Sequence, residues 1–324
     1  MKTVISTDRK AAVELLRKGE IVALPTETVY GLAANALNPI AVAKIFQAKD
    51  RPRFDPLIVH LPNREWLEKI AHLPTRDRQL ICKLANNFWP GPFTIVLSKH
   101  EIVPDIATAG LETVAVRISA HPVFAEIMST FGEPLAAPSA NRFGRVSPTT
   151  AQDVLDELGG RIALIIDAGP TEHGIESTIV AVHGGVIEIL RRGPVTEEQL
   201  SGIAKVATVA PTAKISAPGQ LSSHYAPKTP LRLIDDAKCF SPQKSQRVGL
   251  LTWKSSGFLR ANTDRFVAVQ DLSERQDVRE AAANLFRSLR KLDALGLDLI
   301  VAERVPTAGL GAAIMDRLER ASHR

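Results

Sequence analysis

The fold class of this chain is indicated most directly by residues 20–32, which read EIVALPTETVYGL. The first five residues form a short apolar run that is typical of a buried strand, and Pro25 ends it. The polar segment that follows would lie at the carboxyl end of that strand, where open α/β sheets bind their ligands. The stretch therefore predicts an α/β sheet with a candidate binding loop, although Thr26 and Thr28 could equally cap their own backbone.

Strands and helices alternate on both sides of this stretch. Asp8 predicts a helix that ends before Gly19, and Asn38-Pro39 predicts the start of a second helix that runs to Lys49. Further strands are predicted over 57–61, 94–98, 114–118, 135–137, 162–167, 178–182 and 186–190, and further helices over 64–70, 76–88, 122–131, 149–158 and 196–203. The last two of these strands are joined by a His-Gly-Gly turn typical of an antiparallel hairpin. This pattern predicts an α/β fold with a mixed sheet.

The composition and the periodicity of the sequence change after residue 204. Residues 205–230 contain four prolines and little amphipathic periodicity, which predicts a long linker. Beyond it the alternation resumes, with strands predicted over 231–234, 248–252, 266–269 and 299–302 and helices over 274–295 and 310–321. A chain of 324 residues is long for one domain. We therefore predict a domain over 1–204, a linker over 205–230 and a smaller α/β domain over 231–324.

Composition and charge exclude several classes of protein. Hydrophobic residues make up 45% and charged residues 23%, as in a soluble globular protein. The net charge of +5 divides into −2 over residues 1–203 and +7 over the rest, so the first domain is not basic as a whole. Two distant cysteines disfavour a disulfide scaffold or a zinc ribbon. Neither a signal-peptide core nor a membrane-spanning apolar run is present in the sequence, so we expect a cytosolic protein without a membrane partner.

Two further segments place polar side chains beside strand ends. Residues 49–57 read KDRPRFDPL, so that Lys49 and Arg51 precede a stiff proline-rich stretch, as an anion site requires. Residues 134–141 read PLAAPSAN, in which Ser139 and Asn141 would point the same way if the backbone stays extended. The plainer interpretations are cations that suit a helix C-terminus and an ordinary Ser/Asn turn. Ser147 is expected to cap the next helix.

Together these segments predict a polyanion site without a P-loop. The sequence has no Walker motif, no Gly-x-Ser-x-Gly elbow and no metal-ligand cluster. The candidate cations are Lys49, Arg51, Arg117 and Arg191, and the candidate hydroxyl and amide donors are Thr28, Ser139, Asn141 and Ser177. Such a set, without conspicuous acid/base carboxylates, suits phosphoryl or nucleotidyl transfer by positioning and charge stabilisation.

The order of these motifs resembles a known family. Lys49-x-Arg51 with Ser139-x-Asn141 resembles the KxR…SxN signature of the YrdC-like family, and residues 25–32 match its opening motif. Residues 222–227, which read SSHYAP, and the second α/β domain resemble the long, two-domain branch, the threonylcarbamoyl-AMP synthases. The resemblance implies an N-terminal YrdC-like twisted mixed sheet with helices, a linker, and a smaller C-terminal Rossmann-like α/β domain.

The resemblance also implies an activity. Enzymes of this branch are nucleotidyltransferases that condense L-threonine, bicarbonate and ATP to threonylcarbamoyl-AMP and pyrophosphate. A separate transferase complex then passes the group to tRNA as threonylcarbamoyladenosine. Mg²⁺ is expected on the phosphates, although no acidic cluster indicates it. Direct tRNA contact is left open, as are two alternatives: an RNA-binding protein of the same fold, and a carbamoyltransferase that acts through carbamoyl-adenylate.

The resemblance implies roles for individual residues. The catalytic set would be Lys49, Arg51, Ser139 and Asn141. The ATP site would be lined by Arg51, Asp55, Thr113, Ser139, Ser147, Arg191 and Tyr225, and the threonine site by Thr28, His60, Arg117, Ala137 and Ser177. Position 55 is often Asn in the family, so Asp55 adds a negative charge near the phosphates. We expect Tyr225 to reach the nucleotide from a lid formed by the linker; the alternative is a tyrosine that only docks the linker.

Overall fold

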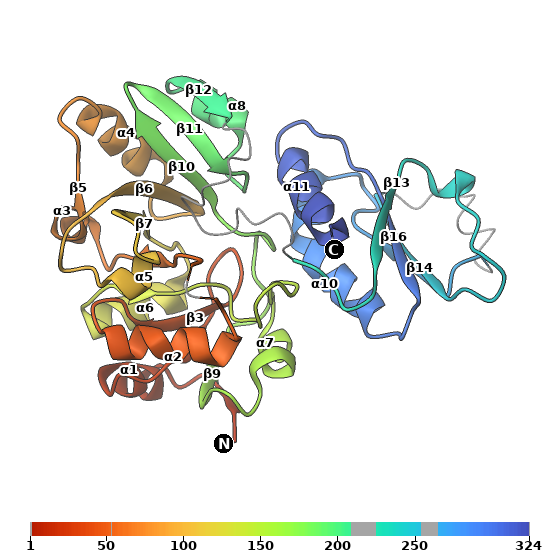
Figure 1. Cartoon of the computed structure of the whole chain (residues 1–324), viewed down its shortest axis with the longest axis horizontal. Helices are drawn as coiled ribbons and strands as arrows, with labels where there is room; N and C mark the ends of the chain where they lie inside the picture. The colour runs from red at the N-terminus through yellow and green to blue at the C-terminus, as the bar shows by residue number, and fades with distance from the viewer. Residues whose placement is uncertain (1, 53, 209–224, 254–264, 324) are drawn as a thin grey trace. The chain divides into compact units, whose positions relative to one another are not determined.

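The computed structural model describes residues 2–52, 54–208, 225–253 and 265–323 (Figure 1). They divide into two compact units. The first unit comprises Met1–Phe143, Pro148–Glu172 and Glu176–Gln220, and the second comprises Gly144–Ser147, His173–Ile175 and Leu221–Arg324. Residues 209–224, which include most of the predicted linker and its Ser222, Ser223 and His224, lie outside the described residues. The domain boundaries that we predicted stay predictions.

The first unit is built on a large mixed sheet. Its strands lie side by side in the order β1 (Val4–Ser6), β9 (Leu164–Ile166), β2 (Val22–Leu24), β3 (Gly31–Asn35), β8 (Leu135–Ala136), β4 (Ile58–His60), β7 (Thr113–Arg117), β6 (Phe93–Lys99), β10 (Thr178–His183), β11 (Val186–Arg191) and β12 (Lys205–Thr208), with β5 (Ala71–His72) paired to β6. Parallel and antiparallel pairs both occur; for example, β4 is parallel to β7 and β6 is antiparallel to it. The predicted α/β class with a mixed sheet is confirmed. The predicted linker, however, begins with four residues that form β12.

The helices of the first unit begin largely where capping chemistry places them. They are α1 (Arg9–Arg17), α2 (Pro39–Lys49), η1 (Arg64–Trp66), α3 (Leu67–Ile70), α4 (Arg78–Phe88), α5 (Asp105–Thr108), α6 (Pro122–Phe131), α7 (Ala151–Leu158) and α8 (Glu197–Ser201). Asp8 and Asn38 cap α1 and α2 as predicted. The expected cap at Ser147 is wrong, because Thr150 and Asp153 form a reciprocal capping box that starts α7 later.

The two faces of the central strands differ in what they carry. Val59, Ile95, Val116 and Val180 lie in the large apolar core. Side chains alternate along a strand, so the intervening residues point to the opposite face. That face carries a much smaller apolar cluster of Ile58, Val96, Ala115, Ile179 and Ala181. We call it the site face, because the same alternation assigns His60, Arg117, Thr94 and Thr113 to it.

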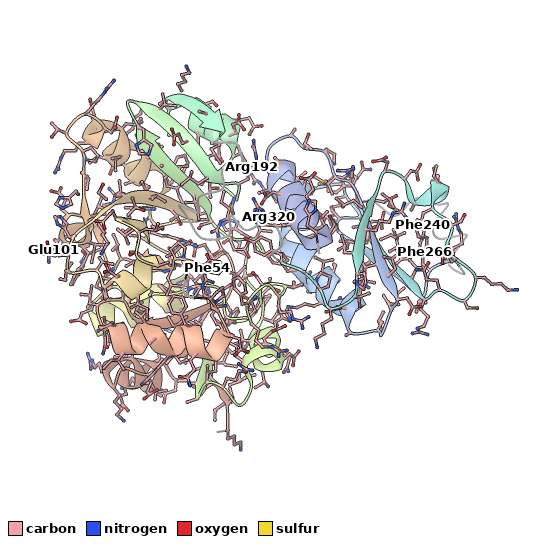
Figure 2. The ribbon with its side chains drawn as sticks, in the orientation of Figure 1. Phe54, Glu101, Arg192, Phe240, Phe266 and Arg320 are labelled. Atoms are coloured by element: carbon pink, nitrogen blue, oxygen red, sulfur yellow. The ribbon has the colours of Figure 1, made fainter. Side chains whose placement is uncertain are left out.

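The second unit contains a parallel sheet of its own. Its strands follow the order β13 (Leu231–Ile234), β16 (Leu299–Glu303), β14 (Val248–Thr252) and β15 (Ala268–Asp271), with α10 (Val278–Asp293) and α11 (Gly311–Ser322) as its long helices. The rings of Phe240 and Phe266 stack at 6.2 Å on this sheet (Figure 2). The second, smaller α/β unit that the sequence predicts is therefore confirmed. Among the described residues, none of the helices is long and apolar enough to cross a bilayer.

Candidate active site

The registers of five strands align polar residues in one row across the site face. His60 on β4 lies opposite Arg117 on β7. Ile95 lies opposite Val116, which places the preceding Thr94 of β6 beside Arg117. Thr94 in turn lies opposite Ile179 of β10, and Ile179 lies opposite Arg191 of β11. Residues that are separated by more than one hundred positions in the sequence are thus brought to a single line on the sheet.

A β-bulge brings Arg191 to this row. Between β10 and β11 the register shifts, so that Val180 pairs with Ile189 whereas Ile179 pairs with Arg191. Leu190 is the extra residue of this bulge. In a regular strand Arg191 would lie on the same face as Ile189 and would point into the apolar core. On the site face its guanidinium donates to the Ser177 carbonyl at 3.0 Å and to the Ser177 hydroxyl at 3.1 Å. That hydroxyl also bonds Thr94 at 2.8 Å, so the predicted Arg191 and Ser177 are directly linked.

Arg117 lies at the centre of a buried polar network. Its side chain is only 3% exposed, and its Nη1 donates to the Thr28 hydroxyl at 3.1 Å. Its Nε donates to the Gly91 carbonyl at 3.1 Å, and its Nη2 lies 2.7 Å from Oε1 of Glu27. Thr28 comes from the loop between β2 and β3, and Arg117 ends β7. The structure therefore joins the opening motif to the arginine that the sequence placed in an apolar strand.

Glu27 is a buried residue of this network that the sequence argument did not single out. It accepts the backbone N–H of Ala120 at 3.0 Å and the hydroxyl of Ser119, besides pairing with Arg117. Burial alone raises the pKa of a carboxyl group, but the charge of Arg117 and these hydrogen bonds outweigh it and lower the pKa of Glu27 to about 2. An acidic residue within a buried Thr-Glu-Thr segment was the available signal, yet its partner lies ninety residues away.

His60 is buried beside Arg117 and stays neutral. Burial, and then the positive charge of Arg117, lowers the pKa of His60 to about 3. Its ring packs on Phe124 with centroids 5.0 Å apart. Within the described part of the chain, neither ring nitrogen has a hydrogen bond of ordinary geometry, and the nearby backbone of Ile58 and Leu135 compensates only in part. A buried polar ring without a strong partner is consistent with a ligand site.

Arg51 and Asp55 form a second buried ion pair, at the other end of β4. Arg51 Nη2 lies 2.8 Å from Asp55 Oδ2 and donates to the Pro56 carbonyl at 2.9 Å. Thr113 is the first residue of β7, and Arg117 is its last. Thr113 and Arg117 are therefore separated by roughly 13 Å along β7, at about 3.3 Å per residue. Within the same loop, Phe54 is 56% exposed (Figure 2).

Lys49 connects the KxR segment to the SxN segment. It is fully buried, and its ammonium donates to the backbone carbonyls of Ser139 and Asn141. Burial, and then the charge of Arg51, lowers the pKa of Lys49 well below its usual value. The extended backbone at Ser139 also bridges to Gly31 of the opening motif. The three motifs that were recognised separately in the sequence are therefore adjacent in the first unit.

The remaining predicted residues lie in two places. In the first unit, the Ala137 N–H donates to the Ile58 carbonyl at 3.0 Å, so its own carbonyl is the group left for a ligand. Ser147 and Tyr225 belong to the second unit. Tyr225 is 1% exposed, its ring stacks on Phe286 at 5.6 Å, and Arg317 lies 5.1 Å from its centroid. These contacts are those of a docking tyrosine, and the contact of Tyr225 with a nucleotide stays a prediction.

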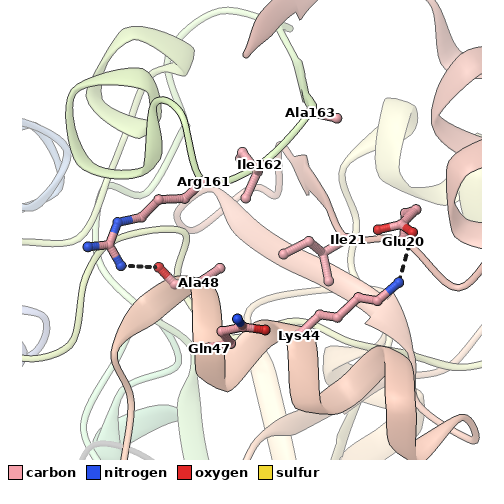
Figure 3. A pocket seen from close by; sticks show the side chains of 8 residues that line it. All are labelled: Glu20, Ile21, Lys44, Gln47, Ala48, Arg161, Ile162 and Ala163. Carbon is pink, nitrogen blue, oxygen red and sulfur yellow. Dashed lines mark hydrogen bonds and ion pairs between the residues drawn. The ribbon is translucent and has the colours of Figure 1, made fainter. Parts of the chain in front are cut away.

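A pocket of about 390 Å³ in the first unit lies apart from these residues (Figure 3). Its lining comprises Glu20, Ile21, Lys44, Gln47, Ala48, Arg161, Ile162 and Ala163. Lys44 pairs with Glu20 at 2.8 Å, and Arg161 pairs with Asp50 at 2.7 Å. The charges at this pocket are balanced by carboxylates of the same unit, and it contains none of the predicted site residues.

Comparison with known proteins accounts for the whole length of the chain. Residues 14–193 match the Sua5/YciO/YrdC family, which carries the description "Telomere recombination", and residues 195–323 match the family "Threonylcarbamoyl-AMP synthase, C-terminal domain". The threonylcarbamoyl-AMP synthase of Pyrococcus abyssi is 38% identical over 97% of this chain and 93% of its own length. That of Bacillus subtilis is 39% identical over 96% and 92%.

A solved structure resembles the chain over both units. The crystal structure of Pyrococcus abyssi Sua5 complexed with L-threonine has a TM-score of 0.86 and 36% sequence identity. The similarity covers 99% of this chain and 97% of that one.

Proposed function

This chain belongs to the two-domain threonylcarbamoyl-AMP synthase family, and from that premise we propose how its residues carry out the reaction. The enzyme forms threonylcarbamoyl-AMP, the product for which its relatives are named. The observation that carries this conclusion is the match over nearly the full length to both the catalytic and the C-terminal families. A carbamoyltransferase with further zinc-finger and acylphosphatase-like modules does not fit that domain composition.

The row on the site face would hold the amino acid substrate. Arg117 would bind the carboxylate of L-threonine, because guanidinium and carboxylate match in a planar, bidentate geometry. The neutral ring of His60 can donate one hydrogen bond or accept one from the substrate, and it adds no charge to the site. The hydroxyls of Thr28 and Ser177 and the carbonyl of Ala137 would complete the contacts. The likeness to a relative that was crystallised with L-threonine supports this proposal.

The other end of β4 and β7 would hold ATP. Arg51 pairs with Asp55 just before β4, Thr113 begins β7, and Lys49 holds the backbone of Ser139 and Asn141. Ser147, Tyr225 and, from the row that would hold threonine, Arg191 are the further residues that we propose for this substrate. The two ends are roughly 13 Å apart. Threonine bound at one end and ATP bound at the other would meet between them, with the threonine amine next to the α-phosphate.

The chemistry would then follow from this placement. The amine of threonine and bicarbonate condense to a carbamate with loss of water. An oxygen of the carbamate attacks the α-phosphorus, the bond to the β-phosphate breaks, and pyrophosphate leaves with the electron pair. Negative charge accumulates on the phosphates during this step, and Arg51, with Asn141 as a neutral donor, would stabilise it.

Mg²⁺ would enter this site with ATP. Glu27 and Asp55, two buried carboxylates of the proposed site, are both paired with arginines. In the part of the chain that the structure describes, no group of three acidic, His or Cys side chains is arranged for a metal. The donor set therefore fits a cation that is held mainly by phosphate oxygens and water, as Mg²⁺ commonly is.

The place of the enzyme in the cell is also part of the proposal. We propose that it acts in the cytosol and that a separate transferase complex consumes its product to form threonylcarbamoyladenosine in tRNA. An adenylate anhydride reacts readily with water, so it has to be passed on or protected. Binding of RNA without nucleotide chemistry is the remaining alternative, and it predicts salt-sensitive RNA binding with no pyrophosphate release.

One experiment separates these functions. The purified protein receives L-threonine, bicarbonate, ATP and Mg²⁺, and pyrophosphate release is followed together with the adenylate product. Release that requires threonine is the expected result. Release that is independent of threonine, or the absence of release in the complete mixture, would contradict the proposal. Omission of each component in turn serves as the control.

A further inference from the structure

Glu27 is a buried carboxylate for which the proposed mechanism has no direct task. It is 4% exposed, and both of its oxygens are engaged by protein groups. Oε1 accepts the Ala120 N–H at 3.0 Å and faces Arg117 at 2.7 Å, while Oε2 accepts the hydroxyl of Ser119. A carboxylate that is saturated in this way is not available to bind a substrate itself. Its effect has to be exerted through the groups that it holds.

The principal group that it holds is the guanidinium of Arg117. Arginine carries five N–H groups in a rigid plane. One is donated to Gly91 and one to the hydroxyl of Thr28, while Nη2 lies 2.7 Å from the Glu27 carboxylate as an ion pair. The interactions that the structure describes thus hold the guanidinium from three sides. A long side chain that is ordered before its ligand arrives does not lose that conformational freedom on binding.

The charge of the pair is maintained over the working pH range. The pKa of Glu27 lies at about 2, since the charge of Arg117 and the hydrogen bonds of Ser119 and Ala120 overcome the effect of burial. Arginine stays protonated in proteins. His60 and His121 are the titratable groups that also face Glu27, and burial lowers the pKa of both. Glu27 is therefore an anion at every pH at which the neighbouring histidines are neutral.

We propose that Glu27 is a positioning residue that orients the guanidinium of Arg117 for the carboxylate of the amino acid substrate. The inference rests on the proposed function, in which Arg117 binds that carboxylate. It implies that selectivity for a free α-carboxylate depends on a residue that never touches the substrate. The competing interpretation is an ion pair that only stabilises the fold.

The test compares Glu27→Gln with a matched control. Gln keeps the size of the side chain and removes its charge. Asp77 offers the control, since it is also buried in the first unit but holds the N–H groups of Gly184 and Gly185 in the β10–β11 hairpin. We expect Glu27→Gln to raise the KM for threonine by about tenfold or more and to change the KM for ATP by less than about twofold. Asp77→Asn should lower thermal stability and leave both KM values unchanged.

A second readout distinguishes positioning from stability. Threoninamide lacks the carboxylate, so its binding as a competitor should be the same in wild type and Glu27→Gln. In an Arg117→Met background, Glu27→Gln should have no further effect on threonine binding. The double variant should therefore bind threonine no more weakly than Arg117→Met alone. Glu27→Asp keeps the charge and should recover part of the threonine affinity. If Glu27→Gln does not fold, the selective rise in KM for threonine is measured in Glu27→Asp, where it should be smaller.

The outcomes separate the two proposals. If the wild-type protein binds threonine and Glu27→Gln binds it equally well, or if both KM values rise together, Glu27 only stabilises the fold and the inference is wrong. Weaker binding of threoninamide by Glu27→Gln would also overturn it. If the wild-type protein neither binds threonine nor requires it for pyrophosphate release, the proposed function fails and the inference fails with it.

Discussion

Asp55 illustrates how a single residue can differ from the expectation that its position raises. The sequence argument placed it in the ATP site and noted that it adds a negative charge near the phosphates. In the structure its carboxylate is 1% exposed and pairs with Arg51 at 2.8 Å. Two of the three arginines that are proposed to bind anionic groups are thus accompanied by a buried carboxylate, Arg51 by Asp55 and Arg117 by Glu27. Substrate binding at these arginines then depends on their orientation rather than on excess charge.

The pairing of Asp55 with Arg51 predicts an asymmetry between two substitutions. Asp55→Asn keeps an oxygen that can accept from Arg51, whereas Asp55→Ala leaves a buried charge without its partner. Breaking a buried pair in the second way costs about 3–5 kcal/mol. We therefore expect Asp55→Ala to lower the free energy of unfolding by at least about 2 kcal/mol more than Asp55→Asn. Chemical denaturation measures both values, and equal losses would show that an oxygen at position 55 does not help to stabilise the buried Arg51.

His60 predicts a pH dependence of stability. Its pKa is about 3 in the folded protein, below the usual histidine value of 6.5. The unfolded chain therefore binds this proton first as the pH falls, and the folded state loses stability below about pH 6.5. Between pH 7 and 5 this effect amounts to at most about 2 kcal/mol. The carboxylate of Glu27 contributes little in that window, because its stabilising effect is lost only as the pH falls from 4.5 towards 2.

The measurement compares wild type with His60→Gln by denaturation at pH 7 and pH 5. The variant should lose less stability between the two values than wild type does. Since burial also lowers the pKa of His121, part of the decrease should persist in the variant. An identical decrease in both proteins would show that His60 does not control this window.

At the scale of secondary structure, the sequence predicts an element well when neighbouring residues along the chain, such as a helix cap, determine it. The helices after Asp8 and Asn38 follow from their caps and are confirmed. Strand β3, in contrast, reads GLAAN in sequence and is not among the strands that the sequence predicts. Glycine and alanine have little preference for strands. These residues form a strand because β2 and β8 pair with them on either side. The strand preference of a residue contains no information about such pairing.

The turn after β11 predicts a position where a methyl group is not tolerated. A Cβ on Gly193 would lie 2.4 Å from the Thr178 nitrogen and 2.6 Å from the Glu176 carbonyl. Gly193→Ala would displace the backbone that carries Ser177, and with it the contacts of Arg191. We expect a loss of about 1–3 kcal/mol in stability and a higher KM for ATP. Gly202→Ala is the control, because its Cβ would meet only ordinary contacts, and unchanged kinetics in Gly193→Ala would contradict the role of this turn.

At the scale of the whole molecule, two segments of the predicted first domain, Gly144–Ser147 and His173–Ile175, belong to the second unit. The Ala226 N–H donates to the Gly144 carbonyl at 2.9 Å. Gly174 packs so closely on the backbone of Ala283 that a Cβ would lie 2.5 Å from it. The sequence placed a single boundary in the linker, because a change in composition marks where a chain segment changes character and not which distant segments it contacts.

Tyr225 supplies the prediction that belongs to this scale. It is buried in the second unit against Phe286 and Arg317. Tyr225→Ala should lower the free energy of unfolding of that unit by about 3–5 kcal/mol, as removal of a buried aromatic ring does elsewhere. Tyr225→Phe keeps the ring and tests the proposed contact with the nucleotide. Product yield and ATP hydrolysis are measured in both; wild-type values in both variants would refute a functional role for this side chain.

The sequence by itself determined the alternation of strands and helices, the second α/β unit, and the motifs that led to the family. These features depend on periodicity, capping and residue identity, all of which are local. Only the tertiary structure decided that His60, Arg117, Thr94 and Arg191 share one row, that a bulge brings Arg191 to it, and that Glu27 pairs with Arg117. Strand order and register are set by pairing between distant segments, and a shift of one residue reverses the face that a side chain occupies.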